Sequence, residues 1–268
     1  MAVLILASKR DVAARNIARE LIRSKQFQPA ADGSGELFQN GEVYLKLVES
    51  DGIYTDSLGV DRKFDAAIFA SRHRSESGEP ALTVHWTGNS TARADFGGKP
   101  KSLSYVDPPR LRAALLALDE ARDALKLNYA VTLEATHHGP TELGVPTLFV
   151  EMGSTEKEWN DTQAAVAAGN AIWKAATAPA SGKSAVGFGG GHYCNKHCAA
   201  IRNDGYAFGH ILSKYFFQDY DEEIVRMAFK RNIGECRTAV IDWKGVRGAE
   251  RTKLVGTLTE MGVEIVRV

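Results

Sequence analysis

Apolar residues occur along the chain in two patterns: short continuous runs, and longer stretches in which they recur every three or four positions. The runs are typical of strands buried on both faces, and the second pattern is typical of helices that bury one face. We predict strands at 3–8, 43–50, 66–73, 82–86, 128–135, 146–153, 184–188, 206–216, 238–243 and 263–268, the one at 206–216 continuing into a helix.

Capping residues mark where the predicted helices begin. Asp11 precedes one helix, and Asp107, followed by two prolines, opens another. Thr155 and Glu158 have the spacing of a capping box, so we predict that they open a long alanine-rich helix ending near residue 177. Shorter helices are predicted at 222–232 and 250–261, while residues 26–40 and 51–63 are predicted to be loops.

Strand and helix patterns that follow one another in this way indicate an α/β protein. We expect a single catalytic domain, residues 1–268, built on a mixed, mostly parallel sheet with helices on both faces. The strands at 43–50, 66–73 and 82–86 have no long helix between them, so that part of the sheet should be mixed. We place an irregular insertion around residues 73–107.

Composition narrows the class of protein. Apolar residues make up 44% of the 268 residues and charged residues 25%, as in ordinary globular proteins, and no apolar run is long enough to predict a membrane span. Three cysteines are too few for a disulfide framework and indicate a reducing compartment, the cytoplasm. Lys plus Arg equals Asp plus Glu at 33 each, so nucleic acid would need local basic clusters. Such clusters occur at 9–10, 72–74, 99–101 and 110–112.

Most of the histidines lie at or near predicted strand ends. They are His73, His85, His137, His138, His192 and His210, and Lys9 and Glu151 are placed in the same way. In parallel α/β sheets, ligands bind beyond the carboxyl ends of the strands. We therefore expect many of these side chains to meet in one site, where His and Glu from different strands could hold a catalytic metal with one position open for water.

A glycine turn follows the strand at 184–188. The sequence GFGGGHY places Gly189, Gly190 and Gly191 before His192, and such a turn lets backbone N–H groups approach a ligand closely. The alternative is a flexible connector. The turn is not a dinucleotide fingerprint, because His192 replaces the third required glycine and no helix clearly follows. The spacing of His192, Cys194, His197 and Cys198 is not a standard zinc pattern, so a structural zinc site is disfavoured.

Three blocks of sequence carry a resemblance to one family: SRHRSESGEPALTVHWTGN at 71–89, LEATHHGPTELGVPTLFVEMGSTEKEW at 133–159 and GFGGGHY at 187–193. They resemble the D-aminoacyl-tRNA deacylases of archaea and plants, and the similarity covers essentially the whole chain. The resemblance implies hydrolysis of the ester between a D-amino acid and the 3′ end of tRNA, with Zn²⁺ as cofactor. It also implies a fold related to peptidyl-tRNA hydrolases and nucleoside phosphorylases. One departure is Cys194-Asn195, since the family pattern predicts a proline near Asn195.

The residue pattern and the resemblance together give the candidate site residues. We expect Glu134, His137, His138 and His192 to carry catalysis. Expected metal ligands are His138, Glu151 and His192, with the number of zinc ions left open. Expected substrate-binding residues are Lys9, Arg72, His73, His85, Asn89, Thr141, Gly189, Gly190 and Gly191.

The expected partner is the acceptor end of D-aminoacyl-tRNA, bound by a monomeric enzyme that proofreads chirality and recycles mischarged tRNA. The alternative is a nucleoside phosphorylase-like or small-molecule ester hydrolase that acts on the same sheet without tRNA. A non-catalytic RNA-binding module is less favoured, because the net charge is zero. Turnover of free D-aminoacyl esters, compared with turnover of charged tRNA, separates these functions.

Overall fold

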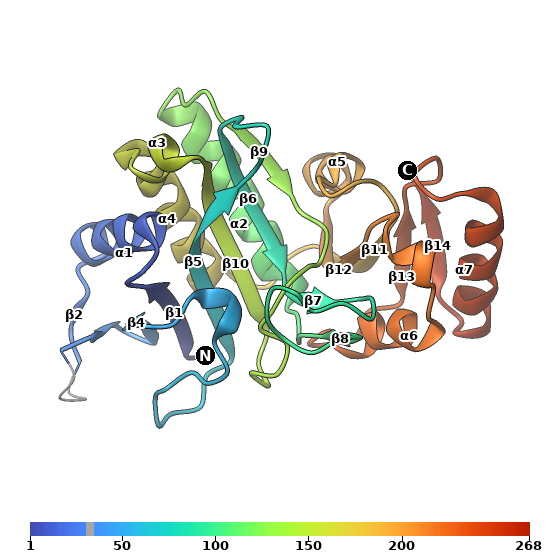
Figure 1. The fold of residues 1–268 in the computed structure, drawn as a ribbon, viewed down its shortest axis with the longest axis horizontal. Coiled ribbons are helices and arrows are strands. Elements are labelled where there is room, and N and C mark those ends of the chain that lie inside the picture. Colours follow the sequence, from blue (N-terminus) through green and yellow to red (C-terminus); the bar gives the residue numbers. More distant parts are fainter. Residues whose placement is uncertain (31–34) are drawn as a thin grey trace.

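A computed structural model describes residues 1–30 and 35–268 and shows two main sheets side by side (Figure 1). The larger has eight strands in the order β2-β3-β4-β1-β5-β10-β6-β9. They are β1 (Val3–Ser8), β2 (Gln28–Pro29), β3 (Leu37–Asn40), β4 (Val43–Val48), β5 (Ala66–Arg74), β6 (Ala81–Trp86), β9 (Ala130–Leu133) and β10 (Thr147–Ser154). Strands β4, β1, β5 and β10 run parallel, β6 and β9 run antiparallel to β10, and β2 and β3 form an antiparallel edge.

The second sheet has four parallel strands in the order β12-β11-β13-β14. They are β11 (Lys183–Phe188), β12 (Tyr206–Leu212), β13 (Thr238–Ile241) and β14 (Glu264–Arg267), and a separate short hairpin pairs β7 (Gly88–Asn89) with β8 (Ser102–Leu103). The indole Nε1 of buried Trp86 in β6 donates a 2.9 Å hydrogen bond to the Phe208 carbonyl of β12, which joins the two sheets. The α/β fold class is confirmed, although the strands divide between two main sheets.

Helices cover the two sheets differently. They are α1 (Val12–Ser24), α2 (Pro108–Ala124), α3 (Glu156–Trp159), α4 (Thr162–Thr177), α5 (Asn195–Asp204), α6 (Glu222–Lys230) and α7 (Gly248–Glu260), with 3₁₀ turns η1 (Gly52–Tyr54) and η2 (Phe216–Asp219). The smaller sheet has helices on both faces, α6 and α7 over one core and α2 and α5 over the other. None of the helices in the described ranges is both long and apolar enough to cross a membrane.

Within the described residues, the larger sheet has α-helices on one face only. There α1, α2 and α4 pack together over a core that includes Ile5, Ile68 and Val150. The opposite face carries Phe69 and Phe149, and the apolar residues packed against this cluster include some from the loops at 53–60 and 143–145. This second face therefore has room for polar side chains beside its short apolar cluster.

Local capping explains where the helices begin and corrects one prediction. The Asp11 side chain accepts from the Ala14 N–H at 3.1 Å and caps α1 as predicted. The capping box of Thr155 and Glu158 is present, but it caps the four-residue α3, and Asp161 opens the long helix α4 separately. The prediction of one continuous helix was wrong because the chain contains two start signals six residues apart, and the second one was overlooked.

Two further elements differ from prediction. Helix α5 directly follows the glycine turn, where no helix was recognised, because its first turn carries polar residues and no standard cap. Strands β2 and β3 and the 3₁₀ turn η1 fall in segments predicted to be loops, and residues 31–34 of the first segment lie outside the described residues. The expected single domain with an insertion at 73–107 stays a prediction.

Two histidines are buried away from the other five. His210 in β12 is fully buried, with Nε2 donating to the Ser104 carbonyl at 2.9 Å and Nδ1 lying 3.1 Å from Thr136 Oγ1. Burial lowers the pKa of His210 to about 4, and it lowers the pKa of His197 in α5 to about 4 as well. Both imidazoles are therefore neutral in the folded protein at pH 7.

These histidines predict acid lability. The unfolded chain protonates each near pH 6.5 and the folded chain only near pH 4, so stability is complete above pH 6.5 and falls as the pH decreases toward 4. We expect the free energy of unfolding, measured by urea unfolding with tryptophan fluorescence, to fall between pH 7 and 4.5. The decrease should be smaller in His210→Gln than in the wild type, by on the order of 2 kcal/mol. If the two proteins lose the same free energy of unfolding over this pH range, the lowered pKa assigned to His210 is wrong.

Candidate active site

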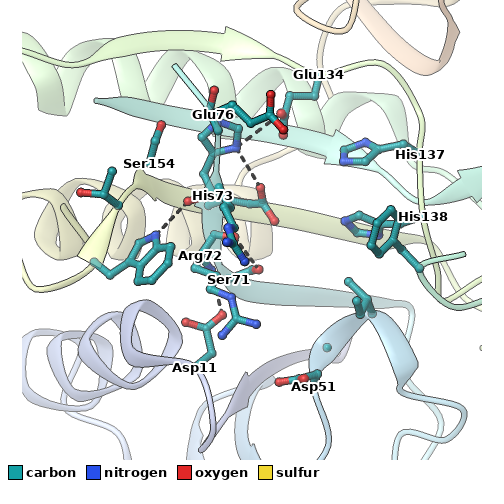
Figure 2. A pocket seen from close by; sticks show the side chains of 18 of the residues that line it. Asp11, Asp51, Ser71, Arg72, His73, Glu76, Glu134, His137, His138 and Ser154 are labelled. Carbon is teal, nitrogen blue, oxygen red and sulfur yellow. Dashed lines mark hydrogen bonds and ion pairs between the residues drawn. The ribbon is translucent and has the colours of Figure 1, made fainter. Parts of the chain in front are cut away.

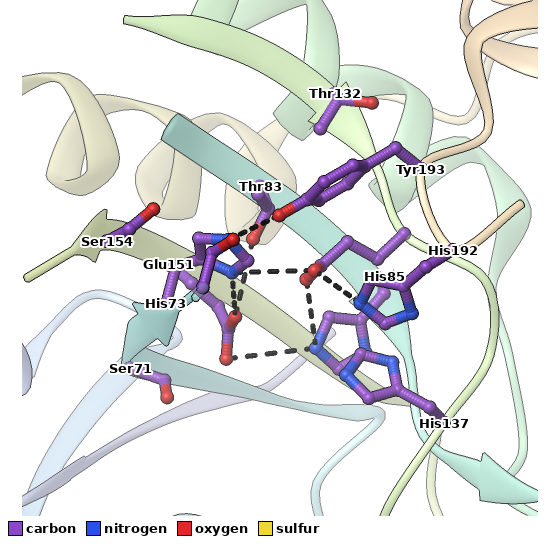
Figure 3. A network of polar contacts seen from close by, with 12 residues as sticks. Ser71, His73, Thr83, His85, Thr132, His137, Glu151, Ser154, His192 and Tyr193 are labelled. Carbon is purple, nitrogen blue, oxygen red and sulfur yellow. Dashed lines mark hydrogen bonds and ion pairs between the residues drawn. The ribbon is translucent and has the colours of Figure 1, made fainter. Parts of the chain in front are cut away.

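Five histidines and two glutamates gather on the face of the larger sheet that no α-helix covers within the described residues. Figure 3 shows His73, His85, His137 and His192 of this cluster together with Glu151. Side chains alternate along β10, so that Val150 and Met152 enter the helix-covered core while Phe149 and Glu151 point the other way. In β6, His85 is opposite Phe149 in the pairing register and therefore shares the second face. The seven residues are His73, His85, Glu134, His137, His138, Glu151 and His192.

Glu134 and Glu151 contact the same two imidazoles. His73 Nδ1 lies 3.4 Å from a Glu134 oxygen and 3.5 Å from a Glu151 oxygen. His85 Nε2 lies 3.9 Å and 3.8 Å from oxygens of the same two carboxylates. Glu134 also accepts a 2.8 Å hydrogen bond from His192 Nε2. Both carboxylates are almost fully buried, so these contacts must replace the water that they have lost.

The contacts decide the charge of each group. Burial would raise the pKa of Glu134, but the hydrogen bond from His192 holds it below the usual value. Burial would likewise raise the pKa of Glu151, yet His73 and His85 hold it well below that value. Burial also opposes a charged His73 or His85, but Glu151 and Glu134 outweigh it and raise the pKa of both histidines. The cluster is thus a compact set of buried opposite charges.

Three imidazoles have the hydrogen-bond pattern of metal ligands. Nδ1 lies 3.2 Å from a backbone carbonyl oxygen in His85, 2.8 Å in His137 and 2.6 Å in His138. Because a carbonyl only accepts, Nδ1 carries a proton in each ring, and Nε2 can offer a lone pair in the neutral form of the imidazole. Carbonyl-fixed imidazoles of this kind are typical of catalytic zinc sites with three histidine ligands.

Two further observations fit a cation at these histidines. One ligand atom from each of His85, His137 and His138 lies within 4.8 Å of the other two, and the buried Nε2 of His85 has no hydrogen-bond partner in the part of the chain that the structure describes. Burial and the charge on His85 lower the pKa of His137 well below its usual value and that of His138 to about 4. Neutral imidazoles are the form that binds a metal, and binding at His85 would release its proton.

The segment 191–194 holds His192 against the larger sheet. The Ala135 N–H donates to the His192 carbonyl at 2.8 Å, and the Cys194 N–H donates to the Leu133 carbonyl at 3.0 Å. Tyr193 between them places its hydroxyl 2.9 Å from His73 Nε2. Sequence reasoning missed the role of Tyr193, although this tyrosine closes the GGGHY block. The segment therefore supplies two groups that touch the buried cluster.

A cavity of about 1070 Å³ opens over the cluster (Figure 2). Of the predicted site residues, its lining includes Arg72, His73, Glu134, His137, His138, Glu151 and His192. It also includes residues that the sequence did not predict to be site residues, among them Asp11, Phe96 and Trp159. The Arg72 guanidinium lies over the Trp159 ring, 5.9 Å from its centroid, and the Trp159 Nε1 donates to the His73 carbonyl at 2.8 Å. The cavity therefore combines a polar floor with two aromatic walls.

Three of the expected substrate-binding side chains have partners outside the lining. Lys9 forms ion pairs with Glu36 and Glu49. Asn89 donates to two carbonyls, those of Gly97 at 2.8 Å and Lys99 at 3.2 Å. The Thr141 hydroxyl accepts from the Lys99 N–H at 3.0 Å. Asn89 and Thr141 thus hold the loop around residues 96–99, and a direct contact with substrate stays a prediction.

The glycine turn also lies outside the lining. Gly189 and Gly190 have φ of 87° and 79°, and a side chain on Gly189 would come within 2.7 Å of Val246 Cγ2. Glycine is thus required here by backbone conformation and by packing against residues 242–246. The turn places His192, while approach of the N–H groups of Gly189, Gly190 or Gly191 to a substrate stays a prediction.

The expected metal ligands His138, Glu151 and His192 do not form one group. His138 lies with His85 and His137, Glu151 lies with His73 and Glu134, and His192 lies with Glu134 and His137. The physical reason is the pleat of the larger sheet, which directs Glu151 toward His73, while the turn after β11 directs His192 toward Glu134. Strand ends alone do not indicate how these residues divide into sets, because that depends on the pairing and pleat of the strands.

The sequence model of the D-aminoacyl-tRNA deacylase family matches residues 60–266 of this chain. The chain belongs to the D-aminoacyl-tRNA deacylase family. Among family members, it is 33% identical over 276 residues to the D-aminoacyl-tRNA deacylase of Methanosarcina acetivorans, covering 99% of this chain and 92% of that protein. It is 36% identical over 275 residues to the D-aminoacyl-tRNA deacylase of Thermococcus kodakarensis, covering 98% and 99%.

A solved structure shares the whole deacylase-family fold seen here. It is the crystal structure of a conserved protein of unknown function, AF0625, which is 34% identical and superimposes with a TM-score of 0.91. The match covers 99% of this chain and 95% of that one. The family resemblance expected from the three sequence blocks is therefore confirmed.

Close packing beside His138 generates a prediction for this deacylase-family chain. A methyl group on Gly139 would collide with the backbone of Gly97 and Gly98 and lie 2.8 Å from the Ile53 carbonyl oxygen. Overpacking costs about 1–3 kcal/mol, and each kcal/mol shifts the melting temperature by about 2–4 °C in a chain of this size. Gly139→Ala should thus melt several degrees below the wild type in calorimetry. Gly248→Ala, which has open space, is the control, and equal melting of the two variants would disprove the packing argument.

Proposed function

We propose that this chain hydrolyses the ester bond of D-aminoacyl-tRNA and releases the free D-amino acid and the tRNA. The observation that carries the proposal is the hydrogen bond between buried Glu134 and His192. The His192 side chain is 44% exposed, and both residues line a cavity of about 1070 Å³. Membership in the D-aminoacyl-tRNA deacylase family supports it. A cavity of this size accommodates an aminoacyl group together with the terminal nucleoside.

His192 is the proposed general base. Ester hydrolysis needs an acceptor for the proton of the attacking water. His192 Nε2 donates to Glu134 at 2.8 Å, which leaves Nδ1 free to accept that proton. The Glu134 carboxylate fixes the ring and its tautomer and stabilises the imidazolium that forms, as carboxylates do in other histidine-based hydrolases. The same imidazolium can then protonate the departing ribose oxygen.

Tyr193 and His73 complete the support of the carboxylates. The Tyr193 hydroxyl orients the His73 ring at Nε2, so that Nδ1 faces Glu134 and Glu151. His73 thereby keeps both buried carboxylates compensated while His192 exchanges its proton. Tyr193 and His73 act here as positioning residues and not as proton acceptors.

Zinc is the proposed cofactor. His85, His137 and His138 would hold it, because their Nδ1 atoms are fixed by carbonyls and their Nε2 atoms are available. When bound, zinc would polarise the ester carbonyl or a water molecule. Glu134, Glu151 and His73 would then neighbour the ion as hydrogen-bonding groups and not as ligands. This proposed set shares His138 with the set expected from sequence, His138, Glu151 and His192, which stays a prediction.

The proposed partner is the acceptor end of D-aminoacyl-tRNA, bound by a monomer in the cytoplasm. Arg72 and Arg74 line the cavity, and both offer donors for phosphate oxygens. The three cysteines are free thiols, which suits a reducing compartment. Release of the uncharged tRNA would return it for correct charging, so that the reaction serves chiral proofreading.

The proposed function predicts a chiral preference. The purified protein should release D-tyrosine from D-Tyr-tRNA and leave L-Tyr-tRNA largely intact, as measured by the loss of acid-precipitable labelled tyrosine. His192→Ala should reduce kcat by about 10²–10⁴-fold, the usual contribution of a general base. Equal rates on the two substrates would contradict the function, and a wild-type rate in His192→Ala would contradict the role of His192.

The metal proposal predicts which variants lose zinc. After dialysis against zinc and removal of the excess, mass spectrometry should find less bound zinc in His137→Ala and His138→Ala than in the wild type. His210→Gln, which replaces a buried histidine outside the group, should retain it. If instead Glu151→Gln and His192→Ala lose zinc while His137→Ala keeps it, the ligand set predicted from sequence holds and the three-histidine site does not.

A further inference from the structure

Phe96 stands out among the residues that line the cavity. Its side chain is 64% exposed, whereas the other large aromatic wall, Trp159, is partly buried and packs against the core. A single exposed ring elsewhere on a surface would need no explanation. This ring lies at the edge of a substrate cavity, where an exposed aromatic face is free to receive a flat ligand group.

The loop that carries Phe96 is held firmly. The Gly139 N–H donates to the Phe96 carbonyl at 3.0 Å, and Asn89 and Thr141 bind the residues that follow. Gly139 directly follows His138, so the position of Phe96 is fixed relative to the histidine group. A ring on a fixed backbone loses little conformational freedom when a ligand stacks on it, so the entropic cost of binding at Phe96 is small.

The loop that carries Phe96 has an excess of positive charge. Residues 90–101 contain three cations, Arg93, Lys99 and Lys101, and one carboxylate, Asp95. Each cation makes an ion pair with a carboxylate and is largely exposed, and such surface pairs are weak enough to exchange for phosphate. Beside Trp159, the lining includes Arg72 and Arg74 as well as the carboxylates of Glu76 and Glu156. Cations on both sides of the cavity can therefore receive phosphates, and the loop around Phe96 supplies those that lie beyond the lining.

We propose that Phe96 is the stacking platform for the 3′-terminal nucleobase of the tRNA, a subsite that rests on the proposed function. The reacting ester must lie at His192, and the nucleobase is separated from that ester by one ribose. With the base stacked on Phe96, the preceding phosphates would lie toward the cationic loop at residues 90–101. The aminoacyl group would lie toward Trp159. Base–aromatic stacking tolerates any base because every base has a π-face, so this contact anchors the chain end without reading its sequence.

The alternative is that Phe96 contacts the amino-acid side chain. Substrates separate the two roles, because a D-tyrosine methyl ester has the side chain and the ester but no nucleobase. Phe96→Ala should lower kcat/KM for D-Tyr-tRNA by about tenfold to a hundredfold, mainly through KM, as loss of one stacked base does. The same variant should hydrolyse the methyl ester at the wild-type kcat/KM. Equal losses on both substrates would overturn the proposal.

A substrate variant tests the contact directly. D-Tyr-tRNA with an abasic 3′-terminal residue should be a poorer substrate of the wild type by the same factor, and Phe96→Ala should lose nothing further on it. Additive losses would show that Phe96 and the base do not touch. Phe96→Tyr should retain the wild-type preference for the intact end, whereas Phe96→Leu, which keeps apolar bulk without an aromatic face, should not. Tyr215→Ala removes a ring of similar exposure, 52%, outside the lining and should match the wild type.

A binding assay makes the test independent of turnover. An uncharged acceptor-stem minihelix ending in CCA should bind the wild type about tenfold more tightly than Phe96→Ala in fluorescence anisotropy. The same minihelix with an abasic end should bind both proteins equally. If the wild type does not hydrolyse D-Tyr-tRNA, the proposed function fails while this comparison still decides the stacking contact. Equal affinity of the two proteins for the intact minihelix would overturn it.

Discussion

Two carboxylates removed from water determine how this site is built. Glu134 and Glu151 line the cavity but are almost fully buried, and a buried carboxylate without a partner would take up a proton instead of remaining charged. The surrounding elements each bring one imidazole to them, His73 from β5, His85 from β6 and His192 from the turn after β11. Breaking one such contact leaves an uncompensated buried charge, which costs far more than the pair contributes. The polar cluster and the fold around it therefore depend on each other.

The two buried cysteines near the site help to hold the backbone that presents Glu134. Cys194 and Cys198 are buried, and burial raises the pKa of both, so they remain thiols. Cys198 Sγ accepts from the Leu133 N–H at 3.1 Å, one residue before Glu134. Together with the Cys194 N–H bond to the Leu133 carbonyl, this contact fixes the backbone that presents Glu134. Where the family pattern led us to expect a proline near Asn195, this chain uses thiols and a helix start to shape the loop.

The sequence predicted the parts of the structure that depend on local pattern. Apolar runs identified the main strands, and Asp11 and Asp107 located two helix starts. The gathering of histidines at strand ends was confirmed for five of them, but not for His210, because an apolar run does not reveal which of its residues is central. Pairing order was also beyond the pattern, so neither the second sheet nor the division of His and Glu into separate groups could be foreseen. Tyr193 was missed because its contact with His73 joins segments distant in sequence, and Phe96 was missed because its place in the cavity lining depends on the fold.

The bond between Trp86 and the Phe208 carbonyl joins the two sheets inside a shared core, and Glu134 and His192 bridge the same junction from opposite sides. A junction built of buried contacts does not act as a hinge, so the two halves of the site keep one fixed separation. Under the proposed function, any adjustment that brings the ester to His192 must then come from the nucleic acid. The unpaired, flexible end of a tRNA can bend into a rigid cavity, and a rigid cavity can distinguish the D from the L configuration of an α-carbon by its shape alone.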